Sequence, residues 1–278
     1  MRHLIIFISF LFTSITMFAT GQEGDIIVIN GERWLLLGKP INTDSLLYNH
    51  LKSVLPKNRS YSTANWDGYT AYWSIVDETL RLDSVSCEFY DAKTRKYRGE
   101  SIHADTLDRV FEKHTDGRHI VASWYSGDIR VARGKQIYYQ HMGFERNYEE
   151  ERFFSISCGK VSNTKTFHNY VLEGFAFDTF RPKDKSELRK MFPLHIENYP
   201  ELANVKRIIF SIRQARVDAQ GNLVECEVKV FKPGDNQRLA AEIAELLKAY
   251  HPWRVSFING EFRANGISGY TIQYSLDE

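Results

Sequence analysis

Cysteine is scarce in this chain of 278 residues, which contains only three: Cys87, Cys158 and Cys226. They are widely spaced, and none belongs to a CxxC pair, so the thiolate pattern of a zinc site or a dithiol redox motif is missing. In an oxidising compartment one disulfide would be permitted, and three buried thiols are equally plausible. Alternation around Cys226 predicts that this residue lies in the core.

An excess of charge is also missing, because 36 Lys and Arg residues stand against 35 Asp and Glu residues. A general nucleic-acid binder needs a basic excess, so we predict no nucleic-acid partner. The HExxH, GxSxG, GxGxxG, P-loop and EF-hand motifs are absent from the sequence. We therefore predict neither a cofactor nor a metal, and we favour a protein that is not an enzyme.

Long hydrophobic runs are missing except at the start of the chain. Residues 4–18 carry no charge, Arg2 and His3 precede them, and Ala19-Thr20-Gly21 places small residues before Gln22. This layout is typical of a secretory signal peptide, and the alternative, an uncleaved anchor, would need a longer run. We predict that residues 1–21 are a signal peptide. The mature protein would be periplasmic or secreted, without a stable membrane span.

Aromatic residues, by contrast, make up 14% of the chain, a content that suits strands. Asn30-Gly31 predicts a tight hairpin between strands at 25–30 and 33–37. Period-2 alternation along 69–75 and a return strand at 80–89 predict an antiparallel pair with one buried face. Residues 22–180 are therefore predicted to form a mainly antiparallel β domain, as a meander, a sandwich or a barrel.

Other elements of this first domain are predicted from shorter patterns. A helix is expected at 43–55, capped by Thr43 or Asp44 and ended by Pro56. Its inward residues would be Leu46, Leu47, Val54 and Leu55. A second helix is expected at 105–113, and the turn Ser126-Gly127-Asp128 predicts a hairpin between strands at 119–124 and 129–132.

A charged stretch with a proline at 181–185 predicts the domain boundary, and residues 181–278 would form an α+β domain. Strands are expected at 207–217 and 223–231 around a turn with Gly221. Val224, Cys226, Val228 and Val230 would point inward. An amphipathic helix capped by Asp235 follows, then an Asn259-Gly260 turn and a last strand at 270–276.

The order of these signals resembles the C-terminal domain of the TonB family. The resemblance covers residues 206–276 and is carried by Val217, Asp218, Gly221, the alternating strand 224–230, Leu246, Trp253, Gly260 and the strand 270–276. It implies a small α+β fold with a helix on a three-stranded antiparallel sheet. It also implies a location in the periplasm of a Gram-negative bacterium and partner binding by pairing of an edge strand.

The chain departs from that family in two respects. It has 7 Pro and no Pro-rich spacer, and Pro252 precedes Trp253, whereas the usual pattern has the proline after the Trp. The resemblance therefore predicts the fold and the compartment of this region, and it does not predict energy transduction.

Two sets of residues are candidates for function. Trp66 and Tyr72 are predicted binding residues, because exposed aromatic rings stack on sugars, although core packing also explains aromatic residues in this region. The alternative, a hydrolase site, would gather His114 and His119 with acidic residues, namely Asp105, Asp108 and Asp128. Solvated loop histidines explain the same positions.

We predict a non-enzymatic binding protein of a Gram-negative-type envelope, with a protein or peptide partner. Binding would use strand addition on the C-terminal sheet or the surface of the first domain. The alternatives are an envelope hydrolase with its site on the first domain and a glycan-binding module.

Overall fold

The computed structural model describes residues 21–140, 142–177, 187–264 and 269–276. It is a strand-rich α+β structure that divides into two compact units, one up to Thr166 and one from Phe167 onward. The predicted signal peptide and the predicted boundary at 181–185 both lie outside the described residues, apart from Gly21. Among the described residues, no helix combines the length and the apolar character that a membrane span needs.

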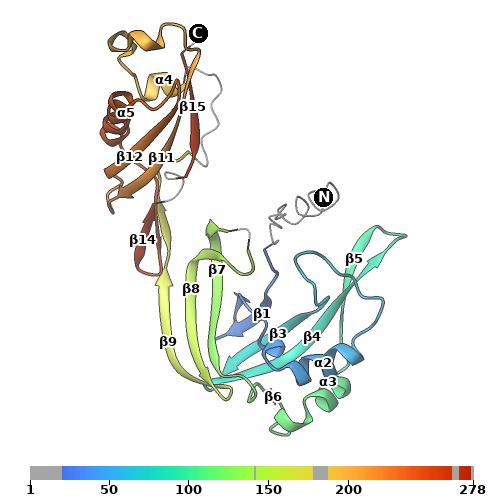
Figure 1. The fold of residues 1–278 in the computed structure, drawn as a ribbon. Coiled ribbons are helices and arrows are strands. Elements are labelled where there is room, and N and C mark those ends of the chain that lie inside the picture. The colour runs from blue at the N-terminus through green and yellow to red at the C-terminus, as the bar shows by residue number, and fades with distance from the viewer. Residues whose placement is uncertain (1–20, 141, 178–186, 265–268, 277–278) are drawn as a thin grey trace, which may run out of the picture. The chain divides into compact units, whose positions relative to one another are not determined.

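The first unit is built on a closed ring of strands, and those that follow residue 127 are the long, curved neighbours labelled β7, β8 and β9 in Figure 1. Within the described residues, the ring contains β1 (Asp25–Ile29), β2 (Glu32–Leu36), β7 (Gly127–Tyr139), β8 (Arg146–Ser157), β9 (Lys160–His168), β4 (Thr79–Asp91) and β3 (Thr70–Val76), in that order. All of its neighbouring pairs for which a direction is given are antiparallel except β1 and β3, which are parallel. The ring closes where β3 pairs with both β4 and β1.

The tight turns of this unit follow the sequence. Asn30 and Gly31 have φ of 52° and 80°, which confirms the predicted hairpin between β1 and β2. Asp77 and Glu78 join β3 to β4 with φ of 49° and 55°, although neither is glycine. Trp73 is fully buried in β3, as the alternation predicts.

The predicted hairpin around Ser126-Gly127-Asp128 is wrong. The preceding strand, β6 (Ile120–Val121), pairs with β4, whereas β7 pairs with β2 and β8. Both strands were expected from their composition, but their partners are distant in sequence. A local turn signal therefore could not identify them.

Two helices pack on the core of the ring, α2 (Ser45–Val54) and α3 (Ala104–Val110). The carboxylate of Asp44 caps α2 by accepting hydrogen bonds from the amides of Leu46 and Leu47. Leu47 is buried, as predicted, but Leu46 is 82% exposed and Val54 is 36% exposed. Those two predictions were wrong, because the buried stripe of α2 runs through Leu47 and Leu51, four residues apart.

The second unit contains a three-stranded antiparallel sheet in the order β12 (Leu223–Lys232), β11 (Arg207–Val217) and β15 (Thr271–Ser275). The helix α5 (Gln237–Ala249) packs against β12 and buries Leu239, Ile243 and Leu247. A smaller sheet contains β10 (Tyr170–Leu172), β13 (Val255–Ile258) and β14 (Glu261–Ala264), and α4 covers Glu187–Met191. Because β10 pairs with β13, residues 170–172 pack with this unit.

Several local predictions for the second unit hold. Gly221 has φ of 84°, and Asn259 and Gly260 have φ of 56° and 81°. Two predictions are wrong. Val224 is 40% exposed, since the pairing of β11 with β12 shifts register beside it, and the cap of α5 is Asn236, whose side chain accepts from the amide of Leu239.

An aromatic cluster fills the core of the second unit. Phe175, Phe177, Phe192, Tyr250 and Trp253 have ring centroids 4.9 to 6.4 Å apart. Trp253 is fully buried, and its indole N–H donates to the carbonyl of Leu247 at 3.1 Å. This bond joins the end of α5 to the segment that leads into β13.

All three cysteines are free. Cys87 is buried, Cys158 is exposed, and Cys226 is half-buried on β12 against the core. The disulfide that the sequence left open is therefore not formed in this structure, and Cys226 has only part of the predicted core burial.

Candidate functional site

One concave site of the first unit is a pocket of about 250 Å³, which we call the loop pocket. Its wall brings together separate parts of the chain: Glu23 before β1, Tyr61 and Asn65 of the connection from α2 to β3, Ser86 and Glu88 of β4, and Tyr97 of β5 (Lys96–Ser101). Small-molecule sites in proteins commonly measure about 300–1,000 Å³, so this pocket suits a small ligand.

The connection from Arg59 to Gly68, which we call the anchored loop, supplies much of this wall. It is rich in Ser, Asn, Asp and Gly, and such residues favour turns over regular structure. Within it, the hydroxyl of Ser62 accepts from the amides of Ala64 and Asn65 at 3.2 and 2.9 Å. The loop is thus folded by its own side chains as well as by its neighbours.

Backbone contacts hold the anchored loop on both sides. The amide of Ser60 donates to the carbonyl of Glu88 in β4, and the amide of Glu23 donates to the carbonyl of Ala64, each at 2.7 Å. Gly68 has φ of 66°, and a Cβ at that position would approach Arg59 Nε to 2.9 Å. Only glycine therefore suits this end of the loop.

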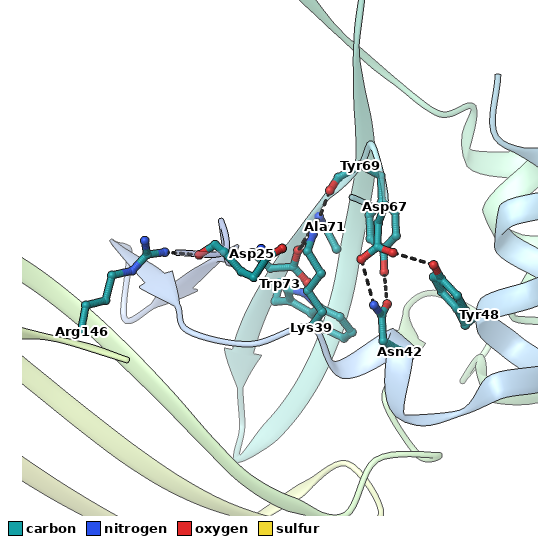
Figure 2. Close-up of polar contacts among 10 residues, drawn as sticks. Asp25, Lys39, Asn42, Tyr48, Asp67, Tyr69, Ala71, Trp73 and Arg146 are labelled. Carbon is teal, nitrogen blue, oxygen red and sulfur yellow. Dashed lines mark hydrogen bonds and ion pairs between the residues drawn. The ribbon is translucent and has the colours of Figure 1, made fainter. Parts of the chain in front are cut away.

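Asp67 ties the same loop to the helical side of the unit (Figure 2). Its carboxylate accepts from Asn42 Nδ2 at 2.9 Å and from the hydroxyl of Tyr48, on α2, at 2.5 Å. Burial and the bond to Asp67 raise the pKa of Tyr48 to about 12. The tyrosine therefore keeps the proton that it donates.

A buried ion pair continues this network behind the pocket. Asp25, which is fully buried, accepts from Lys39 Nζ at 3.3 Å, from the amide of Ala71 at 3.1 Å and from the indole N–H of Trp73 at 3.0 Å. Burial raises the pKa of Asp25 above its usual range, although Lys39 acts in the opposite direction. Three donor contacts to one buried carboxylate fix the start of β3.

Tyr69 joins the two halves of the network. Its carbonyl accepts from Lys39 Nζ at 2.9 Å, and its hydroxyl donates to Asn42 Oδ1 at 2.6 Å (Figure 2). Burial raises the pKa of Tyr69 well above its ordinary value. A continuous chain of polar contacts thus runs from Asp25 to Asp67, so the loop pocket rests on a rigid support.

The predicted binding residues lie near this site and outside its lining. Trp66 projects from the anchored loop and is 65% exposed. Tyr72 is half-buried on β3, with the guanidinium carbon of Arg33 5.9 Å from its ring centre. The lining residues Tyr61 and Tyr97 were missed. The Ser- and Asn-rich stretch before Trp66 was a signal for Tyr61, and no local signal pointed to Tyr97 on β5.

The residues proposed for a hydrolase are not gathered in one pocket. His114 lines a groove of about 410 Å³ between α2 and α3 with Asp44, His50 and Glu112, and none of its lining residues is His119, Asp105, Asp108 or Asp128. His114 Nδ1 contacts the hydroxyl of Ser123 at 2.8 Å. Among the described residues, no group of three His, Cys, Asp or Glu side chains has a metal-binding arrangement.

Comparisons of the chain with protein-family models, with curated proteins and with solved structures found no match. A function for this protein therefore has to be argued from its own residues.

Proposed function

We propose that this chain is a non-enzymatic binding protein of the cell envelope, periplasmic or secreted, whose first unit binds a small polyhydroxylated ligand such as one saccharide unit. The single observation that carries this proposal is the loop pocket, preformed on the Asp25 to Asp67 network. A wall that does not reorganise saves the ordering cost of binding.

The composition of the pocket suits a sugar. Tyr61 and Tyr97 are 56% and 64% exposed as whole residues, so each offers apolar surface beside polar groups. The hydroxyl-rich wall and the carboxylates of Glu23 and Glu88 supply hydrogen-bonding partners for ligand hydroxyls. Trp66 adds an exposed ring on the same loop, and it extends the binding surface for a longer glycan.

Binding is favoured over hydrolysis by the exposure of the two carboxylates. A glycosidase needs one carboxyl group that stays protonated, and burial in an apolar site is the usual means. Glu23 and Glu88 are both exposed side chains. We expect no release of chromophore from nitrophenyl glycosides, and steady release that Glu88→Gln abolishes would establish an enzyme.

The binding proposal is tested by titration calorimetry with a panel of monosaccharides. We expect Tyr97→Ala to lower the affinity for the best ligand about tenfold, because a stacked aromatic anchor contributes about 1–2 kcal/mol to the free energy of binding. The matched control is Tyr270→Ala, an exposed tyrosine of the second unit at 40% exposure. The proposal is overturned if no sugar binds, or if both variants bind alike.

A second candidate function, strand addition by a peptide, is favoured by the free side of β12. Among the described residues, β12 pairs only with β11 along its 10 residues. The order of elements from β11 to β15 supports the proposal that this unit is a TonB-C-like module, a class that binds partners through strand edges. Three register irregularities and its charged residues protect this edge against unselective pairing.

This second candidate is tested with extended peptides selected from a library. If a peptide adds to β12, the amides on the side of β12 that faces away from β11 should become protected against hydrogen exchange. The protection of amides in α5 should not change. A selected peptide that protects no amide of β12 would rule out this edge.

A further inference from the structure

The loop pocket also has a chemical bias that specifies its ligand more closely. Two hydroxyl donors of its wall are committed to the protein. Ser86 donates its hydroxyl to the carbonyl of Glu100 at 3.1 Å, and the hydroxyl of Tyr69 donates to Asn42. Other hydroxyls of the lining, such as those of Ser60 and Thr70, stay available to a ligand, so the bias of the pocket lies in its charge.

The nearest basic side chain is committed in the same way. Arg59 is 7% exposed, and it donates to the carbonyls of Asp67 and Pro56 at 3.2 and 2.9 Å. Its guanidinium carbon lies 4.8 Å from the ring centre of Tyr61. No Lys, Arg or His side chain lines the loop pocket.

The carboxylates of the wall, in contrast, carry unpaired negative charge. Glu23 and Glu88 supply two carboxylates, and neither makes an ion pair within the described part of the chain.

From this imbalance we infer that the ligand of the loop pocket carries an ammonium group beside its hydroxyls, as an amino sugar does. The ammonium group is held by the carboxylates of Glu23 and Glu88. The tyrosine rings favour the same charge, because a cation is attracted to the face of an aromatic ring. This inference rests on the proposed function, since it assigns the ligand class of the same site.

The test compares three hexose scaffolds, each as the neutral sugar, the 2-amino sugar and its N-acetyl derivative. Titrations at about pH 6.5 keep the amine protonated, since amines of this α-amino type have pKa values of about 7.7–8.0. We expect the best amino sugar to bind at least tenfold more tightly than its neutral parent. The N-acetyl derivative, which has lost the charge, does not share this gain.

Charge removal at the wall assigns the effect to the pocket. Glu23→Gln and Glu88→Gln each reduce the preference for the amino sugar at least threefold and leave binding of the neutral sugar unchanged. Glu145→Gln, at an exposed position outside the lining, retains the full preference. Far-UV circular dichroism confirms that each variant is folded.

The outcomes separate the two proposals. Equal binding of neutral and amino sugars overturns the ammonium assignment and leaves the proposed function intact. A preference that survives in both Gln variants overturns it as well. Failure of every sugar to bind overturns the proposed function itself, and the ammonium assignment with it.

Discussion

The two units bury different kinds of side chain. In the first unit, Asp25 and Glu151 are fully buried and Arg59 is 7% exposed. In the described part of the second unit, the buried polar residues are uncharged (Asn169, Ser211 and Ser256), and aromatic rings fill the centre. Buried charges rarely add net stability compared with apolar packing, but each needs a defined set of partners. The first unit is thus specified by polar geometry, and the second by packing.

The largest expected effect comes from removing the centre of the aromatic cluster. Trp253→Ala should destabilise the second unit by about 3–5 kcal/mol, because a fully buried indole is replaced by a cavity. Hydrogen exchange resolved by mass spectrometry should show lost protection in α5 and β11, with β1 to β4 unchanged. Trp66→Ala is the matched control, since that ring is 65% exposed. Similar losses in both variants would contradict the packing account.

Breaking the buried ion pair is expected to have the next largest effect. Asp25→Ala leaves the ammonium group of Lys39, whose side chain is 8% exposed, without a carboxylate, and it leaves the indole N–H of Trp73 without an acceptor. We expect a loss of about 3 kcal/mol in the free energy of unfolding of the first unit. Glu100→Ala, which removes the exposed ion pair with Arg98 from a side chain that is 50% exposed, should cost less than about 1 kcal/mol.

A paired variant sharpens this prediction. If the cost arises from an unpaired buried charge, the double variant Asp25→Asn, Lys39→Met should be less destabilised than Asp25→Ala alone. Chemical denaturation measures both values. If the double variant loses as much free energy of unfolding as Asp25→Asn and Lys39→Met together, the effect comes from packing. The contrast between the two units would then weaken.

Thiol reactivity provides a smaller contrast. Burial raises the pKa of Cys226 to about 11 and also raises that of Cys87, whereas Cys158 is exposed. Since the thiolate is the reactive form, iodoacetamide at about pH 8 should alkylate Cys158 at least tenfold faster than the other two. Peptide mass spectrometry at timed intervals measures the rates. Equal rates would show that Cys226 is more accessible than its half-buried position indicates.

The smallest effect is expected at the turn between β11 and β12. The side-chain amide of Asn222 donates to the carboxylate of Asp218, and this bond is the main cause that lowers the pKa of Asp218 below 3.8. Backbone amides that donate to the same carboxylate lower it further. A lowered pKa in the folded state means that this stabilisation is present above 3.8 and is lost as the pH falls through the folded value. NMR titration should find the pKa raised toward 3.8 in Asn222→Ala. An unchanged pKa would exclude the Asn222 bond as its main cause.

The sequence predicted best those features that depend on a few adjacent residues. The Asn30-Gly31 and Asn259-Gly260 turns were found because positive φ restricts the residues that can occupy them. The cap of α2 was found at Asp44, one of the two expected positions. The partners of β6 and β7 were not found, because strand pairing joins residues far apart in the chain, and one apolar strand predicts no particular neighbour.

The candidate site could be predicted only in part. Trp66 marked the right loop, but the wall around it combines residues from 23 to 97, and only the folded chain brings them together. The network behind the wall depends on Asp25, the first residue of the otherwise apolar strand β1, where a charged side chain is usually exposed. A single carboxylate of this kind carries no periodic signal, so its burial was not predictable.

The closure of the strand ring has a consequence for synthesis of the chain. β4 meets β9 through Thr79 and Lys160, and the amide of Leu80 donates to the carbonyl of Gly159 at 2.9 Å. On that side of β4, a nascent chain that ends before residue 159 already has β5 and β6, and only the Thr79 end lacks its partner, so the ring stays open at this point. Since a ribosome adds about 5–20 residues per second, the ring stays open for seconds after β4 has emerged. A chaperone that protects newly made strands would act during that interval.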